Sequence, residues 1–330
     1  MATAHPLDPL SAGELEQLVA HARAVWGLTE RHLFAFIQLE EPSKAALARG
    51  GTLPRVARLT VLDRDTALVH EGLLTVDGDA LSWTAIPGAK APVLSVETDE
   101  AIAAAKGDSR VAAALALRGV DDVQTQVHME TWPIGAHIPE FLNDGRRLVW
   151  TPMWLRPTPH ANVYAHPING VYAIVDLQSL EVVAVEDHGV TPTPMTPGDW
   201  RLDQTGGTVQ LKNLDITQDH VRSFTVDGWH VDWERWSMRI GWDQREGLVI
   251  HTVSFDDNGN RRAIAHRLSI AELVIPYGDP SQGTYRKNAF DTGEYGLGNY
   301  TNSLTLGCDC LGEIVYLDIC LLYTSDAADE

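Results

Sequence analysis

The chain has 330 residues, a formal net charge of −20 and 44% hydrophobic residues. This length predicts two or three domains, and a charged fraction of only 21% argues against a disordered chain. The sequence has no basic stripe that could neutralise phosphates, which excludes a nucleic-acid partner, whereas the acidic balance favours solubility and attracts cations such as amines or metal ions.

The sequence also gives expectations about membrane association and cellular compartment. No run approaches 18 apolar residues, so we expect no membrane partner. The first residues carry neither a basic region nor an apolar core typical of a secretory leader. Three cysteines do not make a disulfide framework, and the expected localisation is cytoplasmic.

Residues 1–88 are predicted to form a first small α+β domain. Ser11 and Glu14 make a capping-box pattern in front of an apolar stripe with helical spacing. Strand-like runs follow, separated by turn residues, at 32–40, 55–63, 67–76 and 80–86. One helix followed by a strand meander indicates a helix packed on an antiparallel sheet.

Residues 89–192 repeat this order and are predicted to form a second small α+β domain. Two alanine-rich helices are expected at 97–106 and 108–118, each stopped by a glycine. The strands expected after them lie at 123–132, 146–155, 162–168, 170–177 and 181–189.

The remainder divides into a proline-rich linker at 193–211 and an all-strand part at 212–318. Apolar alternation in the tryptophan-rich run changes phase at Glu234-Arg235, which we interpret as a β-bulge. Asn258-Gly259 predicts a tight hairpin, and the tryptophan-rich strand is expected to pair with it. Such antiparallel sheets are typical of a β-sandwich.

Taken alone, the polar residues leave the function open. Asp291 and Glu294 could form an acid–base couple or cap a turn, and in an extended strand they would face opposite sides. Cys308 and Cys310 lack zinc-site spacing, and we expect them on one side of a strand. The chain has no HxH or HExxH motif and no phosphate-binding glycine loop.

Residues 267–318 change this reading because they resemble the copper amine oxidases. The elements IAELVIPYGDP, DTGEYG and GCDCLG occur in order and at the spacing of that family. The resemblance extends over residues 10–318. It implies two small cystatin-like α+β domains followed by the truncated start of a large β-sandwich catalytic domain.

The resemblance also implies a chemistry. Members oxidise primary amines with oxygen to an aldehyde, ammonia and hydrogen peroxide, using copper and a tyrosine-derived topaquinone, and they are homodimers. Asp291 matches the general base, which removes a proton from the carbon next to nitrogen. Cys310 matches one half of a disulfide. The positions that match substrate-binding residues are Ala289, Tyr295, Tyr300, Tyr164 and Trp132.

Other family elements have no match. Asn299-Tyr300 is followed by Thr-Asn and does not fit the quinone motif N-Y-[DE]-Y, and the copper histidines have no counterpart. Residues 319–330, with Cys320, depart from the family and resemble translated adapter sequence. We therefore expect an inactive N-terminal fragment without cofactors, in which 212–318 is loosely folded. The alternative is a non-catalytic amine-binding or interaction module derived from the family.

Overall fold

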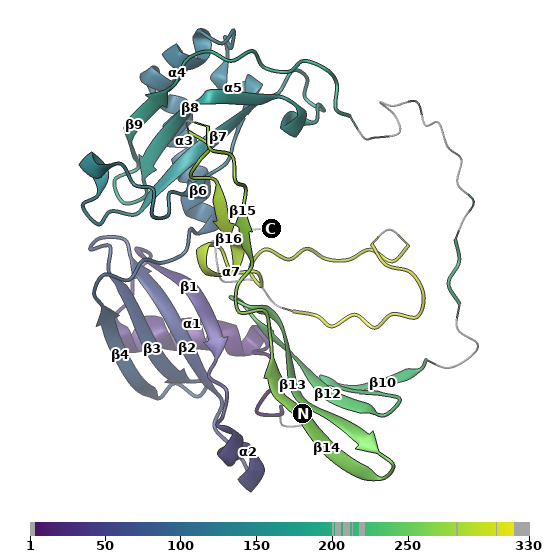
Figure 1. The fold of residues 1–330 in the computed structure, drawn as a ribbon. Helices are drawn as coiled ribbons and strands as arrows, with labels where there is room; N and C mark the ends of the chain where they lie inside the picture. Colours follow the sequence, from purple (N-terminus) through teal and green to yellow (C-terminus); the bar gives the residue numbers. More distant parts are fainter. Residues whose placement is uncertain are drawn as a thin grey trace. The chain divides into compact units, whose positions relative to one another are not determined.

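The computed structural model describes residues 4–199, 201, 206, 212, 214–217, 222–281, 283–307 and 309–319 (Figure 1). These residues form two compact units. Unit 1 takes its described residues from 1–92, 213–274 and 290–330, and unit 2 takes its own from 93–212 and 275–289. The domain bounds given above stay predictions.

The first helix of unit 1, α1 (Ala12–Trp26), begins at the capping box that the sequence predicts. The amide of Glu14 donates to Ser11 Oγ at 3.3 Å, and the amide of Ser11 donates to Glu14 Oε2 at 2.8 Å. This reciprocal capping box satisfies two amides that the helix itself leaves free. Gly27 ends the helix in the left-handed region, with φ of 67°.

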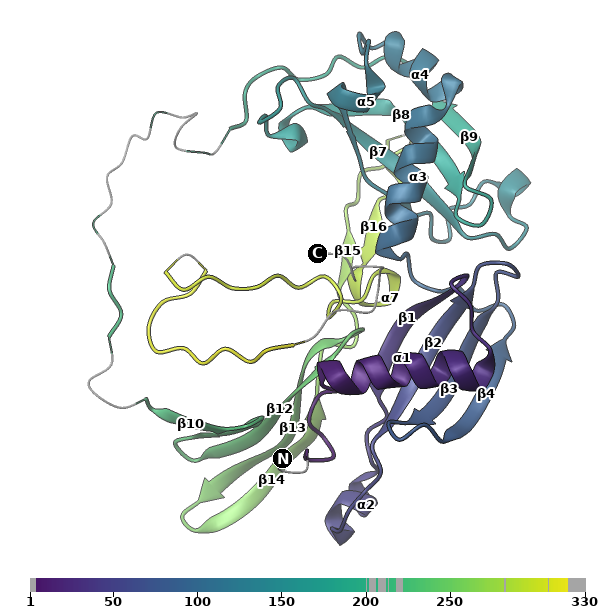
Figure 2. The same cartoon turned by 180° about the vertical axis from the view of Figure 1, so that it is seen from behind.

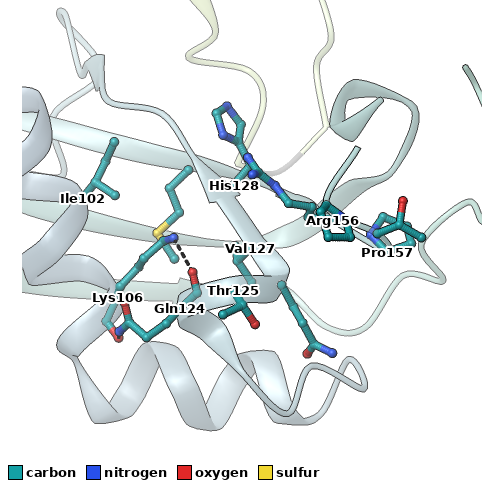
Figure 3. Close-up of a pocket in the computed structure, with 12 residues that line it drawn as sticks. Ile102, Lys106, Gln124, Thr125, Val127, His128, Arg156 and Pro157 are labelled. Carbon is teal, nitrogen blue, oxygen red and sulfur yellow. Dashed lines mark hydrogen bonds between the residues drawn. The ribbon is translucent and has the colours of Figure 1, made fainter. Parts of the chain in front are cut away.

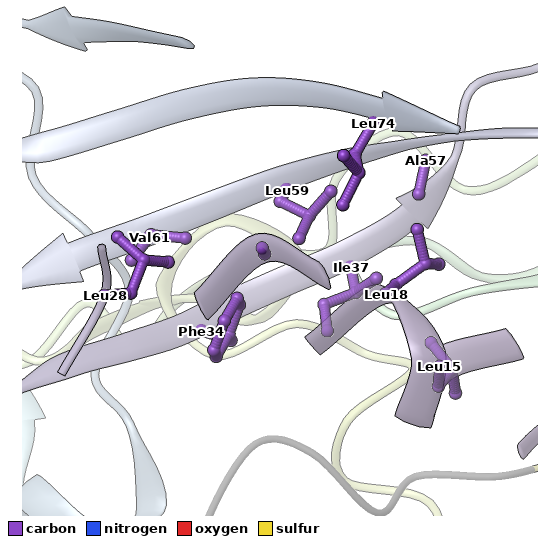
Figure 4. Packing of buried hydrophobic residues seen from close by; sticks show 10 residues of the cluster. Leu15, Leu18, Leu28, Phe34, Ile37, Ala57, Leu59, Val61 and Leu74 are labelled. Carbon is purple, nitrogen blue, oxygen red and sulfur yellow. The ribbon is translucent and has the colours of Figure 1, made fainter. Parts of the chain in front are cut away.

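The four-stranded sheet of unit 1 lies beside α1 (Figure 2). Its antiparallel order is β1-β2-β3-β4, with bounds β1 (His32–Leu39), β2 (Val56–Asp63), β3 (Val69–Thr75) and β4 (Ala80–Ile86). Leu15 and Leu18 of the helix and Leu59 and Leu74 of the sheet share one buried cluster (Figure 4). The sequence did not predict α2 (Lys44–Arg49), which Ser43 caps.

Unit 1 also contains a five-stranded antiparallel sheet of order β10-β11-β12-β13-β14. Its strands are β10 (Phe224–Asp227), β11 (His230–Trp233), β12 (Trp236–Asp243), β13 (Gly247–Asp257) and β14 (Asn260–Leu268). Asn258 and Gly259 form the predicted hairpin turn between β13 and β14, both with positive φ, and β12 pairs with β13 as expected.

The bulge predicted at Glu234-Arg235 is wrong. Trp233 pairs directly with Trp236, so the two residues between them form a tight hairpin turn that joins β11 to β12. Glu234 has a φ of 53°, the left-handed conformation that such turns need. A turn and a bulge change the alternation in the same way, and the sequence contains no glycine here to mark the turn.

Unit 2 places helices against another antiparallel sheet (Figure 2). Its helices are α3 (Ser95–Gly107), α4 (Ser109–Ala116), α5 (Val123–Gln126), η1 (Glu140–Leu142) and η2 (Val163–Ala165). The strand order is β5-β7-β8-β9, with β6 also paired to β7, and the bounds are β5 (Val127–Met129), β6 (Trp132–Pro133), β7 (Leu148–Leu155), β8 (Pro167–Asp176) and β9 (Glu181–Asp187).

Two predicted strands of unit 2 are partly helical. Residues 123–126 form α5, because Asp122 accepts hydrogen bonds from the amides of Gln124 and Thr125 and so caps a turn. In the strand predicted at 162–168, residues 163–165 form η2, and β8 begins only at Pro167. Both stretches are rich in β-branched or aromatic residues, and local capping overrides that propensity.

A buried ion pair holds α3 to the sheet of unit 2. Arg147, just before β7, donates to both carboxylate oxygens of Glu97 at 2.6 and 2.8 Å. Glu97 is completely buried, so this two-pronged contact compensates for removing its charge from water. The mixed helix and antiparallel-sheet class predicted from the sequence is confirmed.

The last elements are β15 (Val274–Pro276), its partner β16 (Asn288–Phe290), and α7 (Asp291–Glu294). Residues 193–199 of the predicted linker contain neither helix nor strand, and most of its remaining residues lie outside those described. None of the described helices is long and apolar enough to cross a membrane.

Candidate functional site

Asp291 and Glu294 open and close the short helix α7 in unit 1. Because residues three apart on a helix lie on the same side, the expectation that the two carboxylates face opposite sides of a strand is wrong. The backbone fixes this turn: Asp291 donates its amide to Leu273 O at 3.1 Å, and Gly296 donates to Asp291 O at 3.0 Å.

Both carboxyl groups hold protons more tightly than usual. Burial raises the pKa of Asp291, and the nearby charge of Glu272 adds to this. Burial, with the charges of Asp291 and Glu272, raises the pKa of Glu294 to about 6 and outweighs the hydrogen bond from the Phe290 amide. Glu294 can therefore keep a proton close to neutral pH, and the pKa of Asp291 is shifted in the same direction.

A glycine loop after α7 packs against the turn that joins β12 to β13. A Cβ on Gly298 would lie 2.1 Å from Asp243 O, and one on Gly296 would lie 2.8 Å from Gln244 O. Only glycine allows this approach. The amide of Leu297 also donates to Arg245 O at 2.9 Å.

The same turn is tied to the first sheet of unit 1. Gln244 Oε1 accepts the amide hydrogen of Ile37 at 2.6 Å, and Gln38 donates to both oxygens of Asp243 at 2.8 and 2.9 Å. The first α+β region thus helps to hold the turn against which the glycine loop after α7 packs, through contacts that sequence reasoning did not find.

Tyr295 and Tyr300, both predicted substrate-binding residues, lie together in unit 1. Their ring centroids are 6.0 Å apart, and the rings meet edge to face at 88°. Tyr300 is half exposed. The structure thus brings these two residues into one aromatic pair beside α7.

Trp132 and Tyr164, two further predicted substrate residues, lie together in unit 2. Glu130 connects them: it accepts from Tyr164 Oη at 2.7 Å and from Trp132 Nε1 at 3.0 Å. His128 Nε2 lies 3.6 Å from the same carboxylate. Sequence reasoning missed Glu130, although its place between His128 and Trp132, at alternating positions of the predicted strand 123–132, was a usable signal.

The environment of Glu130 keeps it ionised. Burial alone would raise its pKa, but contacts from His128, Trp132 and Tyr164 outweigh burial and lower the pKa to about 2. In turn, the hydrogen bond to Glu130 raises the pKa of Tyr164 to about 12. Glu130 is thus a fixed negative charge surrounded by aromatic rings.

An aromatic cage in unit 2 holds the ammonium group of Lys287. Its Nζ lies 4.9 Å from the ring centroid of Trp132, 5.9 Å from that of Trp154 and 4.6 Å from that of Tyr277. These distances are within the range of cation–π attraction. Ala289, which lies in β16 two residues after Lys287, is only 4% exposed.

Cys310 lies in a turn and not on the strand expected from the sequence. Gly307, with φ of 87°, donates its amide to Cys310 O at 2.8 Å, and only an isolated bridge joins Leu306 to Cys310. The Cys310 thiol is 3.1 Å from Tyr316 Oη. Cys308, Cys320 and all but the first residue of 319–330 lie outside the described residues, and the disulfide remains a prediction.

A separate cavity of about 600 Å³ opens in unit 2 (Figure 3). Its wall includes the basic side chains of Lys106, Arg156 and His128, and the Lys106 ammonium donates to Gln124 O at 3.1 Å. No acidic residue is among the described residues that line it. This cavity would repel an ammonium ion and is unsuited to bind an amine.

Comparison with known proteins identifies relatives of both units. The family described as copper amine oxidase, enzyme domain, matches residues 225–329, and the family described as copper amine oxidase, N3 domain, matches residues 96–199. A primary amine oxidase of Arthrobacter sp. (strain P1) is 40% identical over 317 residues, which cover 95% of this chain and 48% of the relative. A peroxisomal copper-containing diamine oxidase of Nicotiana tabacum is 36% identical and is covered to 46%.

A solved structure agrees with these matches. The chain superimposes on a copper-containing benzylamine oxidase from Hansenula polymorpha with a TM-score of 0.82 and 27% identity. The match covers 96% of this chain and 52% of the solved one. The chain therefore spans about half the length of the relatives that it matches.

Proposed function

Because the chain belongs to the copper amine oxidase family, we propose that it forms part of a primary-amine oxidase that requires copper and topaquinone. It supplies the two α+β domains and the opening strands of the enzyme domain. The chain by itself is proposed to be inactive. The substrates are a primary amine and oxygen, and the complete enzyme is a homodimer.

Asp291 is proposed as the base of this reaction. Converting a primary amine to an aldehyde, ammonia and hydrogen peroxide requires loss of a proton from the carbon next to nitrogen and transfer of two electrons to oxygen. A carboxylate with a raised proton affinity suits the first task. The observation that carries the proposal is the raised pKa of Asp291, which lies in the DTGEYG element.

The described residues of this chain do not fit the copper ion of the family. Among the described residues, no group of three or more histidine, cysteine, aspartate or glutamate side chains could hold a metal ion. Asn299-Tyr300 also does not match the quinone motif. Neither copper nor topaquinone is therefore assigned to any described residue of the chain.

The substrate is proposed to be an aromatic or bulky primary amine. Ala289 occupies the position that a gating tyrosine holds in some members of the family, and its methyl group leaves more room than a phenol. The names of the relatives include methylamine and histamine oxidases as well as a benzylamine oxidase, so the family alone does not fix the amine.

Sequencing of the source DNA beyond codon 318 tests the proposal. An oxidase predicts a downstream N-Y-[DE]-Y motif and an HxH pair. The second candidate, a non-catalytic amine-binding or interaction module derived from the family, predicts neither motif. The observation that favours it is the aromatic cage around the Lys287 ammonium group, whose rings are of the kind that attracts such a cation. Absence of both motifs from an open reading frame of family length would contradict the oxidase.

A further inference from the structure

Glu272 contacts the turn of Asp291 from the segment before β15. Its Oε1 accepts the amide hydrogens of Thr292 at 2.9 Å and Gly293 at 3.3 Å. The neighbouring residue, Leu273, accepts the amide hydrogen of Asp291 through its carbonyl oxygen at 3.1 Å. Residues 272 and 273 therefore hold three consecutive amides, those of residues 291, 292 and 293.

Gly293 leaves room beside this carboxylate. A Cβ at position 293 would lie 2.9 Å from Glu272 Oε2, closer than real Cβ contacts. The glycine of DTGEYG thus leaves space for the carboxylate. The side chain of Glu272 is 28% exposed, so water screens its charge only in part.

We propose that Glu272 is a positioning residue for Asp291: it fixes the turn that presents the base and places a second negative charge beside it. This inference rests on the proposed role of Asp291 as the base. No step of the reaction passes through Glu272, which acts only through hydrogen bonds and its charge.

The other charged groups around Asp291 determine how strongly the charge of Glu272 acts on it. Glu294 lies on the same turn and Glu272 on the segment packed against it. Arg245, from the turn between β12 and β13, lies 3.8 Å from Glu272 Oε2 and 3.9 Å from Glu246 Oε1. Arg245 reduces the charge of Glu272 in part, so a like-charge effect on Asp291 persists.

Two substitutions separate the hydrogen bonds from the charge. Glu272→Gln keeps an acceptor oxygen for Thr292 and Gly293 but removes the charge, whereas Glu272→Ala removes both. Glu234→Gln, in the exposed turn between β11 and β12, removes the same charge elsewhere and is the matched control.

The test is an NMR titration of the 330-residue chain with ¹³C-labelled aspartate carboxyl groups, using Asp291→Asn to assign the signal, together with amide hydrogen exchange. The proposal predicts that Glu272→Gln moves the Asp291 midpoint to lower pH with unchanged exchange at 292 and 293. Glu272→Ala is expected to lower the midpoint and also speed that exchange, whereas Glu234→Gln should do neither.

An Asp291 midpoint that stays in place in Glu272→Gln, or exchange at 292 and 293 that stays slow in Glu272→Ala, would overturn the proposal. Should Glu272→Ala fail to fold, Gly293→Ala provides a second variant. Its methyl group would lie 2.9 Å from Glu272 Oε2 and force the carboxylate to shift, so the proposal predicts faster amide exchange at 292 and 293, and unchanged exchange there would also overturn it. None of these measurements requires amine oxidation, so failure of the proposed enzyme function would be visible separately.

Discussion

Glu294 shows at the scale of one residue how the site costs stability. Its folded-state pKa of about 6 lies above its ordinary value of 4.5, so the folded chain favours the protonated form. The stability gained in this way is present below pH ~4.5 and is lost as the pH rises through about 6. Above that pH, an ionised carboxylate stays among like charges in unit 1.

Replacing Glu294 should therefore stabilise the fold only at higher pH. Glu294→Gln keeps an acceptor for the Phe290 amide, which donates to it at 3.0 Å. We expect a gain of at most ~2 kcal/mol in unfolding free energy at pH 7.5, because one pKa unit corresponds to ~1.4 kcal/mol, and almost none at pH 4. Urea unfolding at both pH values checks this, and an equal effect at both would contradict it.

Ala289 provides a second residue-scale prediction, for a complete enzyme that contains this chain. In Ala289→Tyr, the phenol should narrow the approach to the base, and kcat/KM for a bulky amine such as benzylamine should fall more than that for methylamine. Because Ala289 is 4% exposed, the melting temperature must be followed as a control. An equal loss with both amines would refute the hypothesis that the small side chain of Ala289 leaves room for bulky amines.

At the scale of elements, the glycine loop and the turn after β12 act as one assembly. Gly298 approaches Asp243 O so closely that any Cβ must displace backbone. We expect Gly298→Ala to destabilise unit 1 by ~1–3 kcal/mol. Gly13→Ala is the matched control. Nothing lies within 4 Å of a Cβ at position 13 in α1, and alanine is more favourable than glycine in a helix by up to ~1 kcal/mol.

The measurement for this pair is urea unfolding followed by fluorescence, where tryptophans such as Trp236 and Trp242 in β12 report on unit 1. Destabilisation by Gly298→Ala and slight stabilisation by Gly13→Ala are the expected results. Equal midpoints for Gly298→Ala and the parent chain would mean that the loop is not held by the turn.

The elements also show what the sequence can predict. Local signals such as the capping box at Ser11 and the Asn258-Gly259 turn gave correct elements, because nearby residues decide them. The turn at Glu234-Arg235 was mistaken for a bulge, since both reverse the alternation. Glu272 is 20 residues from Thr292 in sequence, and only the fold brings its carboxylate to the amide.

At the scale of the whole chain, unit 1 combines segments that come before and after residues 93–212 in the sequence. Asp8 pairs with Arg239, and Arg267 donates to Glu41 at 2.9 Å, in addition to the contacts of Gln244. We expected residues 212–318 to be loosely folded because the strands that would pack against them were expected in the C-terminal part of the sandwich. In unit 1, residues of the first α+β region make contacts with residues 239–267 and so provide part of the missing packing.

Limited proteolysis measures this association. Met195 is 59% exposed in a stretch without helix or strand, so we expect early cleavage near it. The two products should then co-elute in size-exclusion chromatography and separate only in denaturant, because unit 1 contains parts of both. Separate elution in native buffer would show that the contacts across unit 1 are too weak to hold it.

The central claim, that Asp291 is the base of an amine oxidase, is tested most directly by amine-dependent release of hydrogen peroxide. The protein to use is the complete enzyme that contains this chain, compared with its Asp291→Asn variant at equal copper and quinone content. Loss of a general base should lower the rate by about 100-fold or more, with unchanged folding. Equal rates for the two proteins would contradict the assignment.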